Sequence, residues 1–356
     1  MRKTAINRVK KHIIYFDYLR IFAICAVVVI HVAAQNWYGA NISSMEWDIF
    51  NVFDSVVRWA VPVFVMISGA LFLSKEQPIS KLYKKNILKI LIILAIWTTI
   101  NTVFKVLTTQ GFTTIKAFML DLATGPVHLW FLYMLIGLYM VVPFLQRIVT
   151  DQKTMNYFLL LSLIFAFTIP KLIYIFSIFS PHIAEIITSK ISLMRLDMVL
   201  GFTGYFVLGY KLSQMTLKSN ARIIIYLLGL FGAIFTIVAT ILLSNHDGSP
   251  NAEFYDNLSP NVAAMSIAVF VYAKYHFKQS LRSVKSRRTL SLFARCSLGV
   301  YLVHMMVLDS FSLIGLNTLS FNPLFSVPVI SLSVIIVSYA ISIILYKIPK
   351  IGEWIV

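Results

Sequence analysis

The chain has 356 residues, of which 59% are hydrophobic and only 13% are charged. A soluble core of this size cannot bury so much apolar surface, so the composition excludes a soluble globular domain. The net charge of +17 would suit a nucleic-acid-binding protein, but the cations lie in short segments between apolar runs rather than on one solvated face. We therefore expect no nucleic-acid partner.

Apolar runs long enough to cross a membrane recur along the chain. A bilayer core about 30 Å thick needs a helix of about 20 residues. Runs bounded by charged or turn residues lie near 14–35, 52–73, 86–107, 128–149, 156–178, 197–213, 221–244, 260–277, 290–311 and 324–346. The sequence therefore predicts an all-α, polytopic integral membrane protein with about ten transmembrane helices, give or take about one because the sixth and eighth runs are short.

Basic and acidic residues alternate in the connections between these runs. Connections rich in lysine and arginine lie near 75–89, 147–153, 211–222, 274–295 and 347–350. The intervening connections carry acidic residues such as Glu46, Asp48 and Asp247. Because basic loops stay in the cytoplasm, both termini are predicted to be cytoplasmic. We expect one domain over residues 1–356, with a cytoplasmic segment at 1–13 and a helical bundle at 14–347, in the plasma membrane.

The first predicted helix carries three ionisable residues, Asp17, Arg20 and His31. An ionisable side chain inside a span is costly unless it pairs or faces water, so each is a functional candidate. At about 100° per residue the three side chains point in nearly one direction, with His31 about 16 Å further along the helix than Arg20. The alternative is an interfacial Asp17–Arg20 pair with His31 reaching outward to water, but the shared face favours a function.

Arg58 in the second predicted span would need Asp17, Asp54 or a substrate group as its partner, unless it lies near the outer boundary and reaches water. Small residues in apolar spans, among them Gly69 and Gly209, are expected at points of close helix packing.

Further polar residues lie in later spans. His128 and Trp130 begin the fourth run, where they either anchor the helix at the interface or line a cleft. His304 lies midway along the ninth run, with Tyr301 one turn before it. A lone histidine there is either a core residue or part of a site. Cys25 and Cys296 show no disulfide or metal-ligand spacing, and we interpret them as small core residues.

These residues lie in motifs that resemble the membrane acyltransferase-3 family. Arg20-(x)10-His31 is similar to the first-helix signature, and VPVFVMISGALFL at 61–73 to the F-x-x-S-G-x-L element. HLWFLYMLIGLYMVVPFL at 128–145 and CSLGVYLVHMMVL at 296–308 resemble the later His-x-Trp and Ser-x-x-x-Tyr-x-x-His elements. Phe-Leu replaces the Ser-Leu-x-x-Glu that follows His-x-Trp in the better-known branch, which favours the polysaccharide-tailoring and amino-acid-racemase-associated branch.

The resemblance implies an O-acyltransferase that moves an acyl group, most simply acetyl, from cytoplasmic acyl-CoA to a hydroxyl of an envelope glycan or its lipid-linked precursor. His31 would be the general base, with an acyl-histidine intermediate as a variant. Arg20, beside Asp17, would hold a phosphate or thioester oxygen, or stabilise an oxyanion. The acceptor would be bound by Arg58, His128, Trp130, Tyr301 and His304. No metal is expected.

Coenzyme A is a polyanion, and the inner connections offer cations suited to its phosphates. These are Lys81, Lys84, Lys85, Lys89, Arg287 and Arg288. Topology and attraction to anionic membrane lipids provide an alternative explanation for at least half of them.

Two other functions remain open at this stage. A transporter or polysaccharide exporter would also use an intramembrane stripe of Asp17, Arg20 and His31 for coupling or substrate binding. If the chain were a scaffold subunit of a polysaccharide synthase, these ionisable residues would have no function. Neither a Walker A loop nor a zinc-protease or α/β-hydrolase motif occurs, so those activities have no support in the sequence.

Overall fold

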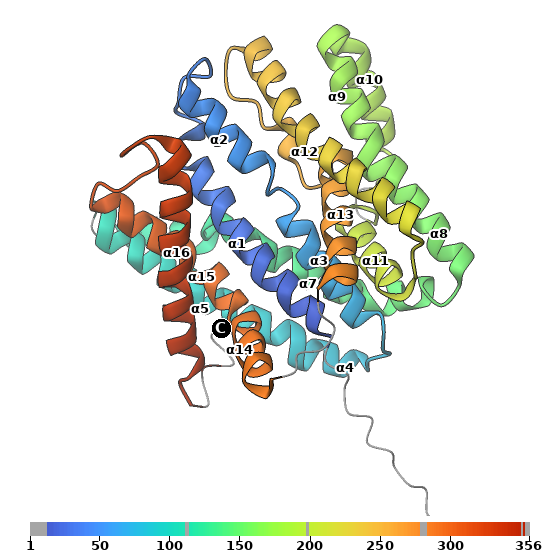
Figure 1. Ribbon diagram of the computed structural model, residues 1–356, viewed down its shortest axis with the longest axis horizontal. Coiled ribbons are helices and arrows are strands. Elements are labelled where there is room, and N and C mark those ends of the chain that lie inside the picture. Colours follow the sequence, from blue (N-terminus) through green and yellow to red (C-terminus); the bar gives the residue numbers. More distant parts are fainter. Residues whose placement is uncertain (1–12, 111–113, 197–198, 278–282, 350–351, 353–356) are drawn as a thin grey trace, which may run out of the picture.

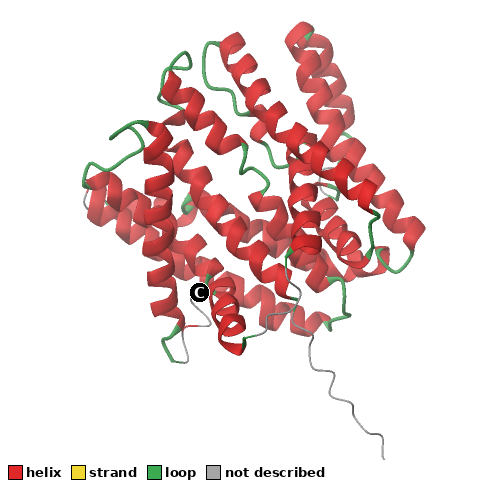
Figure 2. Ribbon diagram, viewed as in Figure 1, coloured by secondary structure: helices red, strands yellow, loops and turns green. Residues whose placement is uncertain are grey.

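The computed structural model describes residues 13–110, 114–196, 199–277, 283–349 and 352. Within these residues the chain consists of helices joined by turns and loops, without a strand (Figure 2). The prediction of an all-α fold is confirmed. Residues 1–12 of the predicted cytoplasmic segment 1–13 lie outside the described residues.

Helices long and apolar enough to cross a membrane make up most of the chain, because a span must satisfy its backbone hydrogen bonds internally. The described residues hold seven of them. They are α1 (Ile14–Trp37), α2 (Met45–Ser55) with α3 (Ala60–Phe72), α4 (Ile79–Lys81) with α5 (Leu88–Lys105), α6 (Ile115–Thr124) with α7 (Trp130–Ile148), α8 (Gln152–Leu161) with α9 (Ile169–Phe179), α12 (Ser219–Asp247) and α16 (Pro323–Tyr346).

The remaining helices explain why about ten spans were predicted. Helices α14 (Val284–Arg295) and α15 (Ser297–Leu313) meet at 53° and give an eighth span if the bent pair crosses as one. Helices α11 (Gly201–Gln214) and α13 (Pro260–His276) match the two short runs, with 14 and 17 residues. The structure thus has seven or eight long apolar helices among its described residues, and ten requires both short helices to cross as well.

Two of the basic connections lie at the same end of the bundle. Helix α4, helix α14 and the start of α1 lie together at the lower end of the molecule in Figure 1. Helix α2 and the hairpin of α9 with α10 (Pro181–Ser192) lie at the upper end. The basic connections around α4 and α14, which were predicted to be cytoplasmic, therefore share one end of the bundle.

Two glycines set the contact between α3 and α11. A Cβ atom at Gly69 would lie 1.8 Å from the carbonyl oxygen of Phe206, and one at Gly209 would lie 2.1 Å from the carbonyl oxygen of Met66. Only glycine permits this backbone approach, as in other closely packed membrane helices. The prediction that Gly69 and Gly209 are packing points is confirmed.

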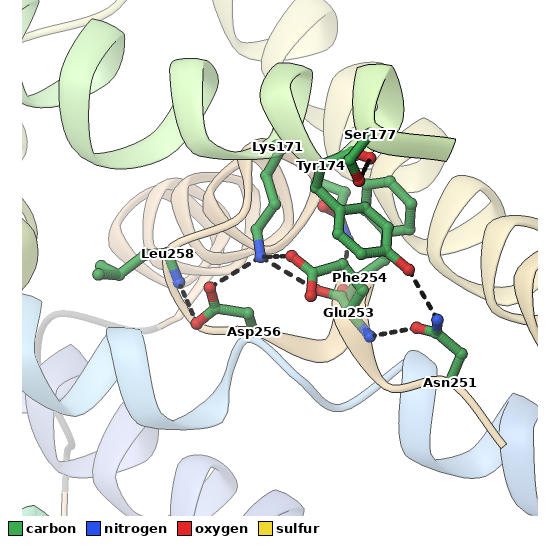
Figure 3. A network of polar contacts seen from close by, with 9 residues as sticks. Lys171, Tyr174, Ser177, Asn251, Glu253, Phe254, Asp256 and Leu258 are labelled. Carbon is green, nitrogen blue, oxygen red and sulfur yellow. Dashed lines mark hydrogen bonds and ion pairs between the residues drawn. The ribbon is translucent and has the colours of Figure 1, made fainter. Parts of the chain in front are cut away.

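An ion-pair network around the buried Lys171 ties α9 to the loop after α12 (Figure 3). Nζ of Lys171 lies 2.6 Å from Oε1 of Glu253 and 2.9 Å from Oδ2 of Asp256. Nδ2 of Asn251 donates to the hydroxyl of Tyr174 at 2.7 Å. Lys171 is only 6% exposed, so these carboxylates supply the partners that a buried cation requires.

Candidate functional site

Helix α1 carries the three ionisable residues that the sequence singled out. Asp17 is 3% exposed, and its Oδ1 lies 3.9 Å from Nη1 of Arg20. Arg20 and His31 line the same cavity, so they share a face of α1 as their spacing predicts. Asp17 does not line this cavity. Its contact with Arg20 accounts for the pair near the N-terminal end of α1.

The cavity that Arg20 and His31 share is called the inner cavity. It has a volume of about 160 Å³ and runs beside α1 from Arg20 to His31. Helix α3 contributes Phe64 and Ser68, and α7 contributes Phe131. Ser297 and Leu298, the first residues of α15, also line it. Because they directly follow the basic helix α14, the bend between α14 and α15 lies beside the cavity.

The outer cavity is larger, with a volume of about 650 Å³, and more polar. It is lined by His31, Asn101, Thr102, Phe104, Lys105, Thr108, Asp121, Thr124, Gly125, Pro126, Val127, His128, Trp130, Met305, Asp309, Ser312 and Leu313. Its walls come from α5 and α15, and the turn between α6 and α7 contributes the segment from Gly125 to Trp130.

Three residues line both cavities: His31, His128 and Trp130. They therefore separate the inner space, which reaches Arg20, from the outer space. His31 comes from α1, whereas His128 and Trp130 come from the short helical turn that starts α7. The structure thus brings together residues that are about 100 positions apart in the chain, as folding of a helical bundle permits.

His304 lies against both of these histidines. Its ring centroid is 5.0 Å from that of His31 and 5.7 Å from that of His128. Nδ1 of His304 lies 2.7 Å from the carbonyl oxygen of Tyr301 and can only donate to it, so Nε2 carries the lone pair in the neutral ring. This Nε2 is buried without a partner among the described residues.

Tyr301 contacts both histidines: its carbonyl oxygen accepts from the ring of His304, and its side chain contacts the backbone of His128. Its hydroxyl donates to the carbonyl oxygen of His128, and its ring lines the inner cavity. Nε2 of His128 is buried and, like that of His304, has no partner among the described residues. Within that part of the chain, no group of three or more His, Cys, Asp or Glu side chains is arranged to hold a metal ion.

Arg58 lies in the turn between α2 and α3. Its guanidinium pairs with Asp54, one of the partners that the sequence suggested, and lies 3.9 Å above the ring of Tyr255. The hydroxyl of Tyr255 donates to Oδ1 of Asn51 at 2.5 Å. Arg58 lines neither cavity. Its ion pair explains why a cation can lie in the span, and its role in acceptor binding stays a prediction.

The predicted donor-binding cations lie at the basic end of the bundle. Lys81, Lys84 and Lys85 are exposed, and Lys89 is half-buried. Arg287 and Arg288 line a separate cavity of about 340 Å³ together with Arg295 and Tyr346. Nη1 of Arg295 donates to the hydroxyl of Tyr346 at 3.1 Å. None of the four lysines lines this cavity, so the structure does not join the two basic groups in one pocket.

Several polar residues of the outer cavity were not singled out as site residues from the sequence. Lys105 and Asp309 lie inside predicted spans, where the rule that flagged Arg20 and His31 would also have flagged them. Asn101 and Asp121 give weaker signals, because an asparagine in a span or a carboxylate in a loop is common.

Comparison with known proteins bears on the whole arrangement. A family model described as an acyltransferase domain (Acyl_transf_3) matches residues 13–347. The match runs from the start of α1 to the end of α16 and includes every residue that lines the inner and outer cavities. Comparison with curated proteins and with solved structures gave no match.

Proposed function

Because the chain belongs to the membrane acyltransferase-3 family, we propose that it transfers an acyl group, most simply acetyl, from cytoplasmic acyl-CoA to a hydroxyl of an envelope glycan or its lipid-linked precursor. One observation carries this proposal. His31 lines both the inner cavity, which reaches Arg20, and the more polar outer cavity. A transferase that joins reactants from two compartments needs its reacting group at such a junction.

The basic end of the bundle suits the donor. Acyl-CoA carries several phosphate charges, which arginine binds through paired hydrogen bonds. Arg287 and Arg288 of α14 line one cavity. Ser297 and Leu298, which follow α14, line the inner cavity. The phosphates would lie at α14 and the lysines of α4 and α5, and the acyl-bearing arm would extend past Arg20 towards His31.

Arg20 then acts on the donor rather than at the reacting carbon. A spacing of eleven residues places it about 16 Å from His31 along α1, which is further than an arginine side chain reaches. Its charge is therefore suited to the phosphate or amide oxygens of the donor, and Asp17 holds the guanidinium in place. Stabilisation of an oxyanion by Arg20 stays the alternative prediction, because Arg20 and His31 line the same cavity.

His31 would act as the general base. A neutral imidazole accepts the proton of the acceptor hydroxyl while that oxygen forms a bond to the thioester carbon. The tetrahedral intermediate collapses as the carbon–sulfur bond breaks, and the imidazolium returns the proton to the leaving thiolate. The products are an ester and free coenzyme A. The unpaired Nε2 of His304, in the ring next to His31, provides a lone pair that can stabilise the imidazolium.

Labelled acetyl-CoA supplied to inside-out membrane vesicles tests the function. We expect covalent label on a glycan with the wild-type protein and none with His31→Ala. His182→Ala is the matched control, because His182 is exposed on α10 and lines neither cavity. Transport of free acetate or of unmodified glycan, without covalent label, would instead support the transporter alternative.

The variants must also be inserted and folded for the comparison to hold. Thermal denaturation of the purified proteins would show whether His31→Ala unfolds at the wild-type temperature. Wild-type turnover by a folded His31→Ala protein would remove the general-base assignment. Label that remains on the protein itself after denaturation, at His31, would indicate the acyl-histidine variant of the mechanism.

A further inference from the structure

Two helix faces form the polar walls of the outer cavity. Helix α5 and its continuation contribute Asn101, Lys105 and Thr108, spaced by four and three residues, and α15 contributes Asp309 and Ser312, spaced by three. Residues at these spacings lie on one face of a helix. The cavity is therefore lined on two sides by hydrogen-bonding groups: an amide, two hydroxyls, an ammonium and a carboxylate.

The charges of this cavity do not balance. Nζ of Lys105 lies 2.9 and 3.0 Å from the two carboxylate oxygens of Asp121, so these two charges neutralise one another. Asp309 lines the cavity and makes neither an ion pair nor a hydrogen bond within the described part of the chain. One negative charge of the lining is therefore left uncompensated.

Two further features point to a ligand of defined chemistry. His128 is 7% exposed and lines the cavity, and its buried Nε2 has no partner among the described residues. Trp130 lines the same cavity with 39% of its surface exposed. A sugar ring presents C–H groups on its face, which an indole can cover, and hydroxyls at its edge, which carboxylate, amide and imidazole groups can bind.

We propose that the outer cavity binds one sugar unit of the acceptor and that Asp309 selects an uncharged or amino sugar against an acidic one. This inference rests on the proposed function, whose acceptor it specifies. The carboxylate of Asp309 accepts hydrogen bonds from sugar hydroxyls or from an ammonium group. A uronic acid would place a second carboxylate in a cavity that already carries an unbalanced negative charge, and two like charges repel at this range.

Binding of paired sugars tests the proposal without any acyl transfer. The probes are methyl glycosides of glucose, galactose and mannose, each compared with the corresponding methyl uronide, which differs only in the carboxylate. Apparent affinity is obtained from the rise in denaturation temperature of the purified full-length protein with probe concentration. We expect at least one neutral glycoside to bind about fivefold to tenfold more tightly than its uronide, because like charges repel.

Asp309→Asn should remove this preference, because asparagine keeps the shape but not the charge. Asp48→Asn is the matched control, since Asp48 is exposed on α2 and does not line the cavity. Equal binding of glycosides and uronides to the wild-type protein, an unchanged preference in Asp309→Asn, or no binding of any probe would each overturn the proposal. If Asp309→Asn does not fold, Ser312→Asp, which adds a second negative charge, should widen the preference.

The two proposals fail in different ways. The protein could select sugars through Asp309 and yet never transfer label from acetyl-CoA. That result would refute the proposed function but support the sugar-binding site. Transfer of label without selection between the paired sugars would keep the function and refute the role of Asp309.

Discussion

The hydroxyl of Tyr301 positions His128 at the boundary between the cavities. Tyr301→Phe removes the hydrogen bond to the carbonyl oxygen of His128 and leaves that buried acceptor unpaired. We expect the free energy of unfolding to fall by about 1 kcal/mol. The maximal rate of acyl transfer should fall about tenfold with little change in either KM, because a misplaced group reduces the rate of the reaction more than the binding of the substrates.

Initial rates against donor and acceptor, together with thermal denaturation, check this prediction. Tyr133→Phe is the matched control, since Tyr133 is exposed on α7 and lines neither cavity. A change confined to the acceptor KM would contradict the positioning role and indicate direct contact between Tyr301 and the acceptor.

Arg20 is expected to act on the donor. Arg20→Ala should raise the KM for acyl-CoA about tenfold or more and change the KM for the acceptor much less, because a charged hydrogen bond to the donor is lost. The substitution also removes a partner from the buried carboxylate of Asp17, which lowers stability. The double variant Asp17→Asn with Arg20→Ala separates these effects. It should regain stability but not donor affinity, and recovery of both would assign Arg20 a structural role alone.

At the level of helices, the contact between α3 and α11 decides whether the inner cavity keeps its shape. Gly209→Ala places a Cβ 2.1 Å from the carbonyl oxygen of Met66, so the helices must move apart. We expect a loss of about 3 kcal/mol of stability, typical of overpacking, and a lower denaturation temperature. Gly137→Ala in α7 is the control, because nothing lies within 4 Å of its Cβ position. Equal effects of the two changes would show that the helices pack less closely.

The extent of each helix was only partly predictable from hydropathy. A run of apolar residues marks where the chain can lie in lipid, and each such run is helical over most of its described length. It does not show how a helix bends. The predicted span 290–311 is bent by 53° where α14 meets α15, and α14 carries exposed arginines. Helices α11 and α13, with 14 and 17 residues, are shorter than the helices that hydropathy alone marks as spans.

For the molecule as a whole, the sequence predicted the parts of the site that lie on one helix better than those that meet across helices. The shared face of Arg20 and His31 follows from helical periodicity alone. The contact of His31 with His304, which lies 273 positions later, depends on how α1 and α15 pack, and only the family resemblance hinted at it. Asp309 was missed because no motif includes it, although its place in an apolar run marked it as costly.

The orientation of the bundle gives the last prediction. If the basic end is cytoplasmic, Val127 is accessible from the exterior and Lys285 is accessible from the cytoplasm. Val127 is 88% exposed and lines the outer cavity, and Lys285 is exposed on α14. With Cys25 and Cys296 replaced by alanine, an impermeant maleimide should label Val127→Cys in intact cells, and Lys285→Cys only after the membrane is opened.

The reverse labelling pattern would mean that the bundle has the opposite orientation in the membrane. The predicted donor-binding cations would then lie on the wrong side for cytoplasmic acyl-CoA. Labelling of both positions from one side would mean that the two cavities open to the same compartment. The predicted pattern places His31 between two compartments, since it lines the cavity that reaches Arg20 at the basic end and the cavity that contains Val127. Acyl transfer at His31 would then move the acyl group across the membrane without a separate transport step.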